Sequence, residues 1–433
     1  MTRDLFDLVD ERTGLIRSLS RVSKSREEPE VPFVYSARLA NFDFRKRDLS
    51  ERTASGKGAS DEAAGRGAIA EALERYCACQ PDVERLRLAS DSELSAPACP
   101  PDAFVLYSER QYSNPRCIYR RPTAGQRLTW IQAQRVGGDA PLFVPASLVY
   151  MNFAGPSNSE LFAPATSNGL AAGRDVAAAV LAGLYELIER DAFVITWLNR
   201  LPVSRIAFGD GDGIAGDIAR HYRRFGIETV AFDMTTDINV PVVMGLAIDR
   251  SGAMPAVVTG LGCNLNPAVA LERALMEISQ VRTGGAARYR QNPGQRLPVR
   301  HEDVRTLEDH ASFAASPANL PIFSFLLDGK SERRLADMPD RSSGDAGADL
   351  EACRACLAEV GSTACWVDLT LPDIEPYGVR VVRTLATGLQ PIHFGYGEER
   401  LGGRRPFSVP RILGYADRDR SEDEMNRCLH PLA

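Results

Sequence analysis

Hydrophobic and polar positions divide the chain into two kinds of segment. Short runs rich in β-branched residues, including PLFVPASLVYM (141–151), VPVVMGLAI (240–248) and VRVVRTLATGL (379–389), are typical of strands. Segments rich in Ala and Leu, such as GAIAEALERY (67–76) and AGLYELIERDA (182–192), are typical of helices. Because the two kinds alternate along the chain, we expect a mixed α/β (α+β) fold.

The two helical segments carry the same phrase, Glu-x-x-Glu-Arg, in surroundings that are otherwise nearly apolar. Gly58 precedes Glu71 by thirteen residues, and Gly173 precedes Glu186 by the same thirteen. Each unit therefore reads as a glycine-rich turn followed by a helix. A weaker third unit, GLGCNLNPAVALERALMEISQVR (260–282), has a glutamate at 277, Gln280 in place of the second glutamate, and an arginine at 282.

The paired glutamates point to a ligand. Two glutamates three residues apart share one helical face, where like charges repel. A solvated, ion-paired face would explain a single helix of this kind, but repetition at matched spacing favours a ligand that neutralises the carboxylates. Carboxylate oxygens suit Mg²⁺, and Mg²⁺ suits phosphates, which the arginines and Lys57 could also contact. We therefore expect a helical nucleotide site with Mg²⁺ at Glu71, Glu74, Glu186 and Glu189.

Two standard phosphate-binding motifs fit the sequence less well. SGKGAS resembles part of a P-loop, but Glu51 stands where the first glycine belongs and Gly58 replaces Ser or Thr after the lysine. Gly211-x-Gly213-x-x-Gly216 has the order of a dinucleotide fingerprint. Three aspartates crowd the place of its pyrophosphate, which would oppose an anion at the helix N-terminus.

Composition narrows the class of protein. The chain has 433 residues and a formal charge of −6, whereas binding to nucleic acid calls for a basic stripe. No apolar run approaches the roughly 20 residues of a membrane span. The opening MTRDLFDLVDERTG is charged in its first turn, unlike a secretory signal. Nine scattered cysteines fit a reduced compartment. We expect a cytoplasmic protein without nucleic-acid or membrane partners.

Four blocks of sequence, taken together, resemble the YcaO superfamily. They are SGKGASDEAAGRGAIAEALERY, SNGLAAGRDVAAAVLAGLYELIERDAFVITWLNRLP, the third unit, and VVRTLATGLQPIHFGYGEERLG. They occur in family order between about residues 50 and 405. The closer resemblance is to the azoline-forming branch, the docking-scaffold or D protein of peptide cyclodehydratases. It implies a YcaO-type fold with repeated helix-plus-strand units around a central nucleotide site.

The resemblance also implies an activity. Such enzymes use ATP and Mg²⁺ to activate a backbone amide of a ribosomal precursor peptide, so that a Cys, Ser or Thr side chain attacks it and a thiazoline or oxazoline forms. The residues expected to contact ATP are Lys57, Gly67, Glu71, Glu186, Arg200, Gln280, Arg282 and Arg383. Arg383 and the carboxylate of Ala433 are expected to act in catalysis.

The sequence departs from the family pattern at three places. Gly67 replaces a usual serine, and Thr387-Gly388 replaces a usual Pro-Gly. The ending CLHPLA keeps only the middle proline of a usual Pro-x-Pro-x-Pro. Two alternatives therefore stay open. One is a YcaO-type thioamide or amidine synthase, and the other is a catalytically reduced scaffold that docks the peptide.

The resemblance divides the chain and implies partners. Residues 1–50 are expected to form an irregular or partly helical lead-in, 51–410 the catalytic domain, and 411–433 a tail that reaches the active site. The short lead-in leaves no room for a fused ThiF-like (ubiquitin-activating-type) domain, so we expect a separate ThiF-like partner. A flavin dehydrogenase in the same complex and a homodimer are further expectations.

Overall fold

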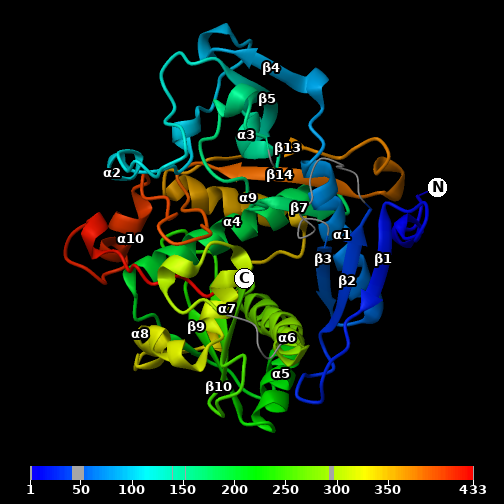
Figure 1. The fold of residues 1–433 in the computed structure, drawn as a ribbon, viewed down its shortest axis with the longest axis vertical. Helices are drawn as coiled ribbons and strands as arrows, with labels where there is room; N and C mark the ends of the chain where they lie inside the picture. The colour runs from blue at the N-terminus through cyan, green and yellow to red at the C-terminus, as the bar shows by residue number, and fades with distance from the viewer. Residues whose placement is uncertain (1, 41–52, 139, 152, 292–296, 433) are drawn as a thin grey trace.

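The computed structural model describes residues 2–40, 53–138, 140–151, 153–291 and 297–432. Three β-sheets surround the long helix α4 (Val176–Asn199). In Figure 1 the six-stranded sheet lies above α4, the five-stranded sheet below it and the three-stranded sheet to one side. This mixture of helices and sheets confirms the expected fold class.

Most neighbouring strands are antiparallel. The three-stranded sheet has the order β1 (Ile16–Arg21), β2 (Phe33–Leu39), β3 (Thr53–Gly58). The five-stranded sheet has the order β11 (Val257–Cys263), β10 (Val242–Asp249), β9 (Ile227–Asp233), β8 (Arg205–Ala207), β12 (Glu332–Arg334), and only β8 and β12 pair in parallel. The six-stranded sheet has the order β4 (Leu86–Ala89), β5 (Leu128–Arg135), β13 (Ala364–Asp368), β14 (Arg380–Ala386), β7 (Leu170–Gly173), with β6 (Pro141–Pro145) paired to β5.

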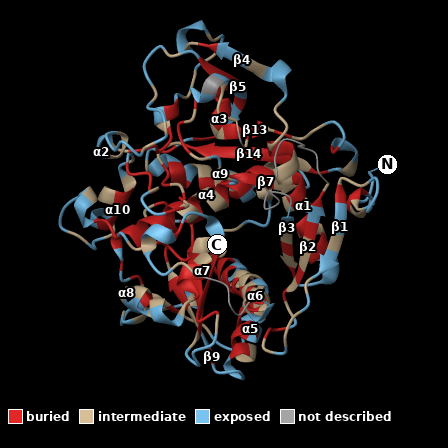
Figure 2. Ribbon diagram, viewed as in Figure 1, coloured by how far each residue is buried: buried red, intermediate tan, exposed pale blue. Residues whose placement is uncertain are grey.

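Helices cover these sheets and fill the space between them. The longer ones are α1 (Asp61–Ala78), α5 (Gly213–Arg223), α6 (Pro267–Gln291), α7 (Leu307–Ala314), α9 (Ala346–Glu359) and α10 (Arg405–Ile412). Single turns form α2 (Glu109–Tyr112), α3 (Ala146–Val149) and α8 (Ser324–Leu327). Helix α1 packs on β3, α6 packs on β11, and α4 packs on β14 and β7 while also touching β10 and β11. Most of α4 is therefore buried, as Figure 2 shows.

The three sequence units form three strand–helix pairs, β3 with α1, β7 with α4, and β11 with α6. Glycines bring each strand against the backbone of its helix. A Cβ atom added to Gly56 would lie 2.1 Å from the amide nitrogen of Ala68 on α1. Added to Gly173 or Gly262, it would lie 2.6 Å or 2.0 Å from the nearest backbone atom of α4 or α6. Because no side chain fits between the backbones, each helix is fixed tightly on its strand.

The first forty residues differ from the expected irregular lead-in. Strands β1 and β2 lie there; β1 pairs with β2 and β2 pairs with β3, so this segment supports the first strand–helix unit. A short 3-10 turn, Leu5–Leu8, packs its apolar residues on the same core. The charged opening of the chain masked this pattern. Residues 41–50 of the expected lead-in lie outside the described residues.

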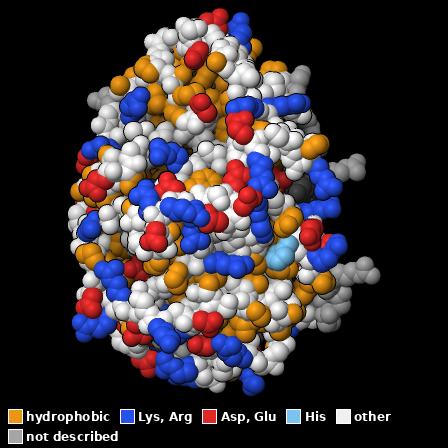
Figure 3. Space-filling view, turned by 90° about the vertical axis from the view of Figure 1, so that its left-hand side faces the viewer, with side chains coloured by type: hydrophobic (Ala, Val, Ile, Leu, Met, Phe, Trp, Pro, Cys, Tyr) orange, Lys and Arg blue, Asp and Glu red, His pale blue; other side chains and the backbone are white. Residues whose placement is uncertain are grey.

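Two further observations concern the charge of the surface and the possibility of a membrane-spanning helix. Acidic and basic side chains are intermixed over the face that carries α2, α8 and α10 (Figure 3). Across the described part of the chain, no helix combines the length and the apolar character needed to cross a membrane.

Candidate functional site: a pocket lined with glutamates

The three strand–helix units meet at a pocket of about 700 Å³. Its walls come from β3, α1, α4, α6, β11 and α7, together with Pro431 from the end of the chain. Six of the residues expected from the sequence to form a nucleotide site line it, namely Lys57, Gly67, Glu71, Glu74, Glu186 and Gln280. The repeat therefore brings residues more than 200 positions apart to one cavity.

The two α1 glutamates are held by backbone amides. Glu71 accepts a hydrogen bond from the Ser55 amide (3.1 Å) and pairs with Arg75 (2.7 Å). Glu74 accepts from the Ala172 amide at the edge of β7 (2.7 Å). Burial, followed by repulsion from the carboxylates of Glu71 and Glu186, raises the pKa of Glu74 well above its ordinary value. Glu74 therefore keeps its proton more readily than an exposed glutamate does.

Helix α4 repeats this arrangement. Glu186 accepts from the Gly169 amide (2.9 Å), and Arg190 lies 3.6 Å from Glu186 and 3.3 Å from Glu189. Burial raises the pKa of Glu189 to about 7, although Arg190 opposes the shift, and the carboxylates of Glu277 and Glu186 raise it further. Glu189 stands beside the pocket wall rather than among the lining residues.

Helix α6 closes the pocket against β3. The Lys57 ammonium lies 3.0 Å from Glu277, and the Gln280 amide donates to the Ser55 hydroxyl over 2.6 Å. Both members of the ion pair are partly exposed to the pocket, Lys57 at 24% and Glu277 at 21%. Such a pair is weak in water, so Lys57 can exchange its carboxylate for a phosphate oxygen.

The donor set fits Mg²⁺ bound together with phosphates. Glu71, Glu74, Glu186 and Glu277 supply hard oxygen atoms to one cavity. Among the described residues, no three acidic, His or Cys side chains stand close enough to hold an ion by themselves. Mg²⁺ commonly takes one or two carboxylates and completes its shell with phosphates and water, so an open set of glutamates is what a nucleotide-dependent site requires.

Two arginines of the expected site lie elsewhere. Arg200 caps the far end of α4 in a left-handed conformation (φ 46°). Since it follows Glu186 by fourteen residues, it lies about 21 Å further along the helix. Arg282 is buried on the other side of α6, where it bonds to Glu28 and stacks over the Tyr222 ring. A residue two positions after Gln280 cannot share its helical face.

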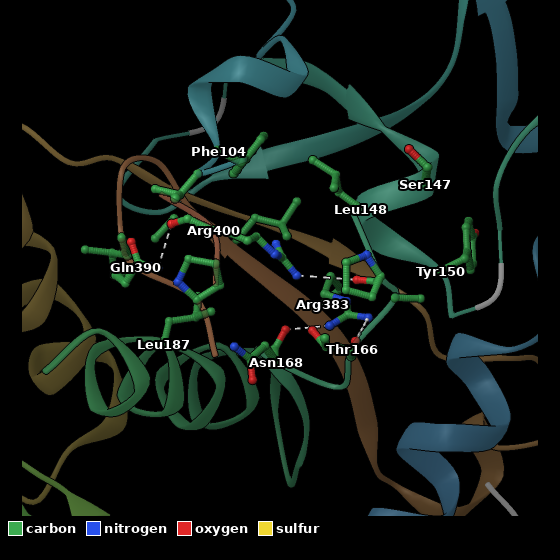
Figure 4. A pocket seen from close by; sticks show the side chains of 17 residues that line it. Phe104, Ser147, Leu148, Tyr150, Thr166, Asn168, Leu187, Arg383, Gln390 and Arg400 are labelled. Carbon is green, nitrogen blue, oxygen red and sulfur yellow. Dashed lines mark hydrogen bonds between the residues drawn. The ribbon is translucent and has the colours of Figure 1, made fainter. Parts of the chain in front are cut away.

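Arg383 on β14 is buried behind the pocket wall. Its guanidinium donates to the backbone carbonyls of Val149 (2.9 Å), Thr166 (2.8 Å) and Asn168. Burial lowers the pKa of Arg383 to about 10. The segment 164–168 separates it from the glutamates, because Ser167 lines the glutamate pocket while its neighbours line a second cavity around Arg383 (Figure 4). A phosphate contact of Arg383 stays a prediction.

The end of the chain is seated beside the pocket. Leu429, His430 and Leu432 are buried, and the Thr259 hydroxyl donates to the Pro431 carbonyl (3.3 Å). The His430 ring stacks on His310, with centroids 4.2 Å apart. The tail is therefore packed against the body of the protein, and its Pro431 lines the glutamate pocket. Ala433 itself lies outside the described residues, so its catalytic role stays a prediction.

Five charged residues that line the pocket were not assigned by number to the ATP or Mg²⁺ site, namely Arg75, Arg190, Glu277, Arg288 and Glu308. Arg75 and Arg190 complete the two Glu-x-x-Glu-Arg phrases, and Glu277 opens the third unit. Their position in the repeat was the available signal, because a residue four after a glutamate lies on the same helical face.

The glycine fingerprint has a different role. Gly211 and Gly213 lie in an exposed turn before α5, and β8 pairs antiparallel with β9. A dinucleotide fold needs parallel strands at this point. The structure therefore contradicts the dinucleotide alternative, and the turn is a surface connection.

Comparison with protein families identifies the family of the chain. The model for "YcaO cyclodehydratase, ATP-ad Mg2+-binding" matches residues 55–390, which include every strand and helix that lines the pocket except the tail. The chain belongs to the YcaO family. ATP and Mg²⁺ are accordingly its cofactors, and the glutamate pocket is where the donor set fits them.

Other YcaO relatives agree in sequence and fold. An uncharacterized protein of Methanothermobacter thermautotrophicus is 28% identical over 82% of this chain and 85% of its own length. A heterocyclase in complex with substrate and cofactor superposes with a TM-score of 0.81 at 25% identity, covering 98% of this chain. This chain spans only 56% of that heterocyclase. The YcaO protein of Methanopyrus kandleri, bound with AMPPCP and Mg²⁺, shares the fold (TM-score 0.64, 22% identity, 89% of this chain and 88% of that one).

Proposed function

We propose that this chain is the ATP-dependent cyclodehydratase subunit of a peptide-modifying complex. The observation that carries the proposal is the joining of three strand–helix units at one pocket, in a chain whose whole fold matches a substrate-bound heterocyclase. The substrate would be a ribosomal precursor peptide, and the products thiazolines or oxazolines at its Cys, Ser or Thr residues.

The chemistry assigns separate tasks to the two ends of the pocket. A Cys, Ser or Thr side chain adds to the preceding carbonyl and closes the ring, the resulting oxyanion takes the γ-phosphoryl group of ATP and releases ADP, and loss of phosphate and of the amide proton then forms the C=N bond of the azoline. Lys57, Arg75 and Arg190 would hold the phosphates. The carboxylates of Glu71 and Glu186 would hold Mg²⁺, which neutralises phosphate charge when bound. The apolar end, with Val257, Ala311 and Tyr289, would take the nucleoside.

The family resemblance suggests the partners, and one fold neighbour is part of a complex. A microcin synthetase complex of three different subunits, McbBCD, contains a chain of this fold. We infer that this protein likewise acts with a separate ThiF-like protein that binds the precursor peptide, in the cytoplasm. A flavin dehydrogenase and a second copy of this chain are further proposed members of the assembly.

Peptide mass spectrometry tests the proposal. The chain is incubated with ATP, Mg²⁺, the precursor peptide and the ThiF-like protein encoded beside it. Loss of one water per modified residue is expected, together with release of ADP and phosphate. Exchange of oxygen for sulfur would instead identify a thioamide synthase, and an unchanged peptide with a competent partner would identify a scaffold.

Two variants test the site within the same assay. Glu71→Ala and Glu186→Ala should each abolish ATP turnover. Glu62→Ala is the matched control, because Glu62 lies on α1 with a side chain 69% exposed and away from the pocket. Near-normal turnover in either pocket variant would show that the nucleotide binds elsewhere.

A further inference from the structure

A second cavity lies behind the glutamate pocket and holds two buried arginines. It has a volume of about 80 Å³, several times the roughly 10–15 Å³ that one water molecule needs. Arg383 and Arg400 are only 2% and 7% exposed. Figure 4 shows both guanidinium groups at this cavity, with Phe104 and Leu148 above them and Leu187 and Asn168 below. It shares no lining residue with the glutamate pocket.

The two arginines differ in how many of their N–H groups donate hydrogen bonds. Arg383 donates to three backbone carbonyls and is fixed by them. The Arg400 side chain makes one long hydrogen bond, 3.4 Å to the Pro164 carbonyl, and its Nε atom is buried without a partner. A guanidinium carries five donors, so most of those on Arg400 remain available.

No described carboxylate forms an ion pair with either guanidinium, although Glu74 and Glu186 favour the charged form of Arg383 from further away and Glu398 does the same for Arg400. None of the described Asp or Glu oxygens lies within 4.0 Å of either guanidinium. Asn168 adds another donor, since its side-chain nitrogen is buried and has no partner. Burying a cation without an anion is unfavourable, and a bound anion would remove that penalty.

The walls define which anion fits. Phe104, Leu148, Leu187, Leu385 and Leu389 make much of the lining apolar. A planar carboxylate can take two parallel hydrogen bonds from one guanidinium, and a short hydrocarbon chain would cover the leucines. The small volume excludes a nucleotide or a long acyl chain. A groove of about 740 Å³ that shares Phe104 and Val105 with the cavity lies next to it and offers a route of entry.

We propose that this cavity is a binding site for a carboxylate group on a short apolar chain, with Arg400 as its main ligand and Asn168 beside it. The carboxylate comes either from a free small acid or from an acidic side chain of a bound peptide. The cavity shares no lining residue with the glutamate pocket, and its binding is tested without nucleotide.

Binding is measured by calorimetry and thermal unfolding on the full chain without nucleotide. Butyrate should bind and raise the Tm, and the neutral isostere butyramide should not. In Arg400→Met the affinity for butyrate should fall about 10- to 100-fold, as expected for loss of a charged bidentate contact. Arg17→Met, at an exposed position on β1 that lines neither the cavity nor the groove, should bind like the wild type.

Two readouts keep the test independent of folding damage. Because the Arg400 side chain makes only one long hydrogen bond and buries its Nε atom without a partner, the ligand-free Arg400→Met protein should unfold at the same temperature as the wild type or higher. Leu148→Phe should block butyrate while keeping both arginines. Equal binding of butyrate and butyramide, equal affinity in the two arginine variants, or a lowered Tm of ligand-free Arg400→Met would each overturn the proposal.

A peptide arm separates the two sources of the carboxylate. An acetylated pentapeptide with a central glutamate is compared with its glutamine counterpart and with butyrate. Tighter binding of the glutamate peptide than of butyrate identifies a peptide side chain, and the reverse identifies a free acid. Both results support the site, whereas equal binding of the two peptides together with no response to butyrate would contradict it.

Discussion

Replacing Glu189 by glutamine should stabilise the ligand-free protein and weaken its response to Mg²⁺ and ATP. The Glu189 side chain is 12% exposed, and its pKa is raised to about 7, first by burial and then by its acidic neighbours. A folded-state pKa above the ordinary 4.5 means that the folded protein holds this proton more tightly than the unfolded chain. The stability from this group is therefore complete below about pH 4.5 and is lost as the pH rises through about 7.

The size of the effect follows from the pKa. At 1.36 kcal/mol per pH unit, a rise from 4.5 to about 7 corresponds to about 3 kcal/mol. Glutamine resembles the protonated side chain at every pH. At pH 8 we expect Glu189→Gln to exceed the wild type in free energy of unfolding by about 3 kcal/mol, or about 3 °C in Tm for a chain of this length. At pH 4.5 the two proteins should be equally stable.

Urea unfolding from pH 4.5 to 8 in EDTA, without nucleotide, measures this difference. Glu62→Gln serves as control and should follow the wild-type curve. The same samples with saturating Mg²⁺ and ATP should show ligand stabilisation in the wild type and a clear loss of it in Glu189→Gln. Parallel pH curves for Glu189→Gln and wild type, or a less stable variant at pH 8, would refute the reasoning.

Three other predictions concern packing, charge and the tail. A Cβ on Gly67 would lie 3.5 Å from the nearest atom, so Gly67→Ala should stabilise the protein by about 0.5–1 kcal/mol. A Cβ on Gly56 would collide with the backbone of α1, so Gly56→Ala should destabilise the protein by about 3 kcal/mol. Urea unfolding of both variants measures these differences. Lys57→Met should raise the KM for ATP about tenfold, while the coupling between Lys57 and Glu277 in a double-mutant cycle stays below about 1 kcal/mol. His430→Ala should lower kcat more than it changes the KM for ATP, because the ring seats the tail; a change in KM alone would contradict this.

The sequence was sufficient to predict the site where helical periodicity carried the information. Spacing from a glycine to a glutamate placed Glu71 and Glu186 in one pocket, and Gln280 followed from the third unit. The same periodicity also argues against Arg282 as a residue of this pocket, because it lies two residues from Gln280 and faces another side of α6. A match to a family motif located the helix but did not say which way each side chain points.

Positions set by tertiary contacts could not be predicted in this way. Arg383 was expected at a phosphate, yet three carbonyls from distant segments hold its guanidinium. Two of those carbonyls, from Thr166 and Asn168, belong to a loop, and the third ends the single turn α3; neither leaves a periodic signal. Strands β1 and β2 escaped notice because their partner β3 lies beyond an intervening stretch of polar residues. The seating of the tail depends on His310 and Thr259, which no local pattern near residue 430 reveals.

The close contacts between strands and helices imply that two kinds of substitution can be told apart by their effect in cells. At Gly56, Gly173 and Gly262 a side chain would collide with a helix backbone, so such variants should be cleared by quality control and reduce protein abundance. At Glu71 and Glu186 the variants should accumulate normally and lose only activity. A saturation-mutagenesis screen that records abundance and activity separately should therefore divide the sensitive positions into two sets. Substitutions at the strand–helix contacts should lower abundance, and substitutions at the pocket glutamates should lower activity alone.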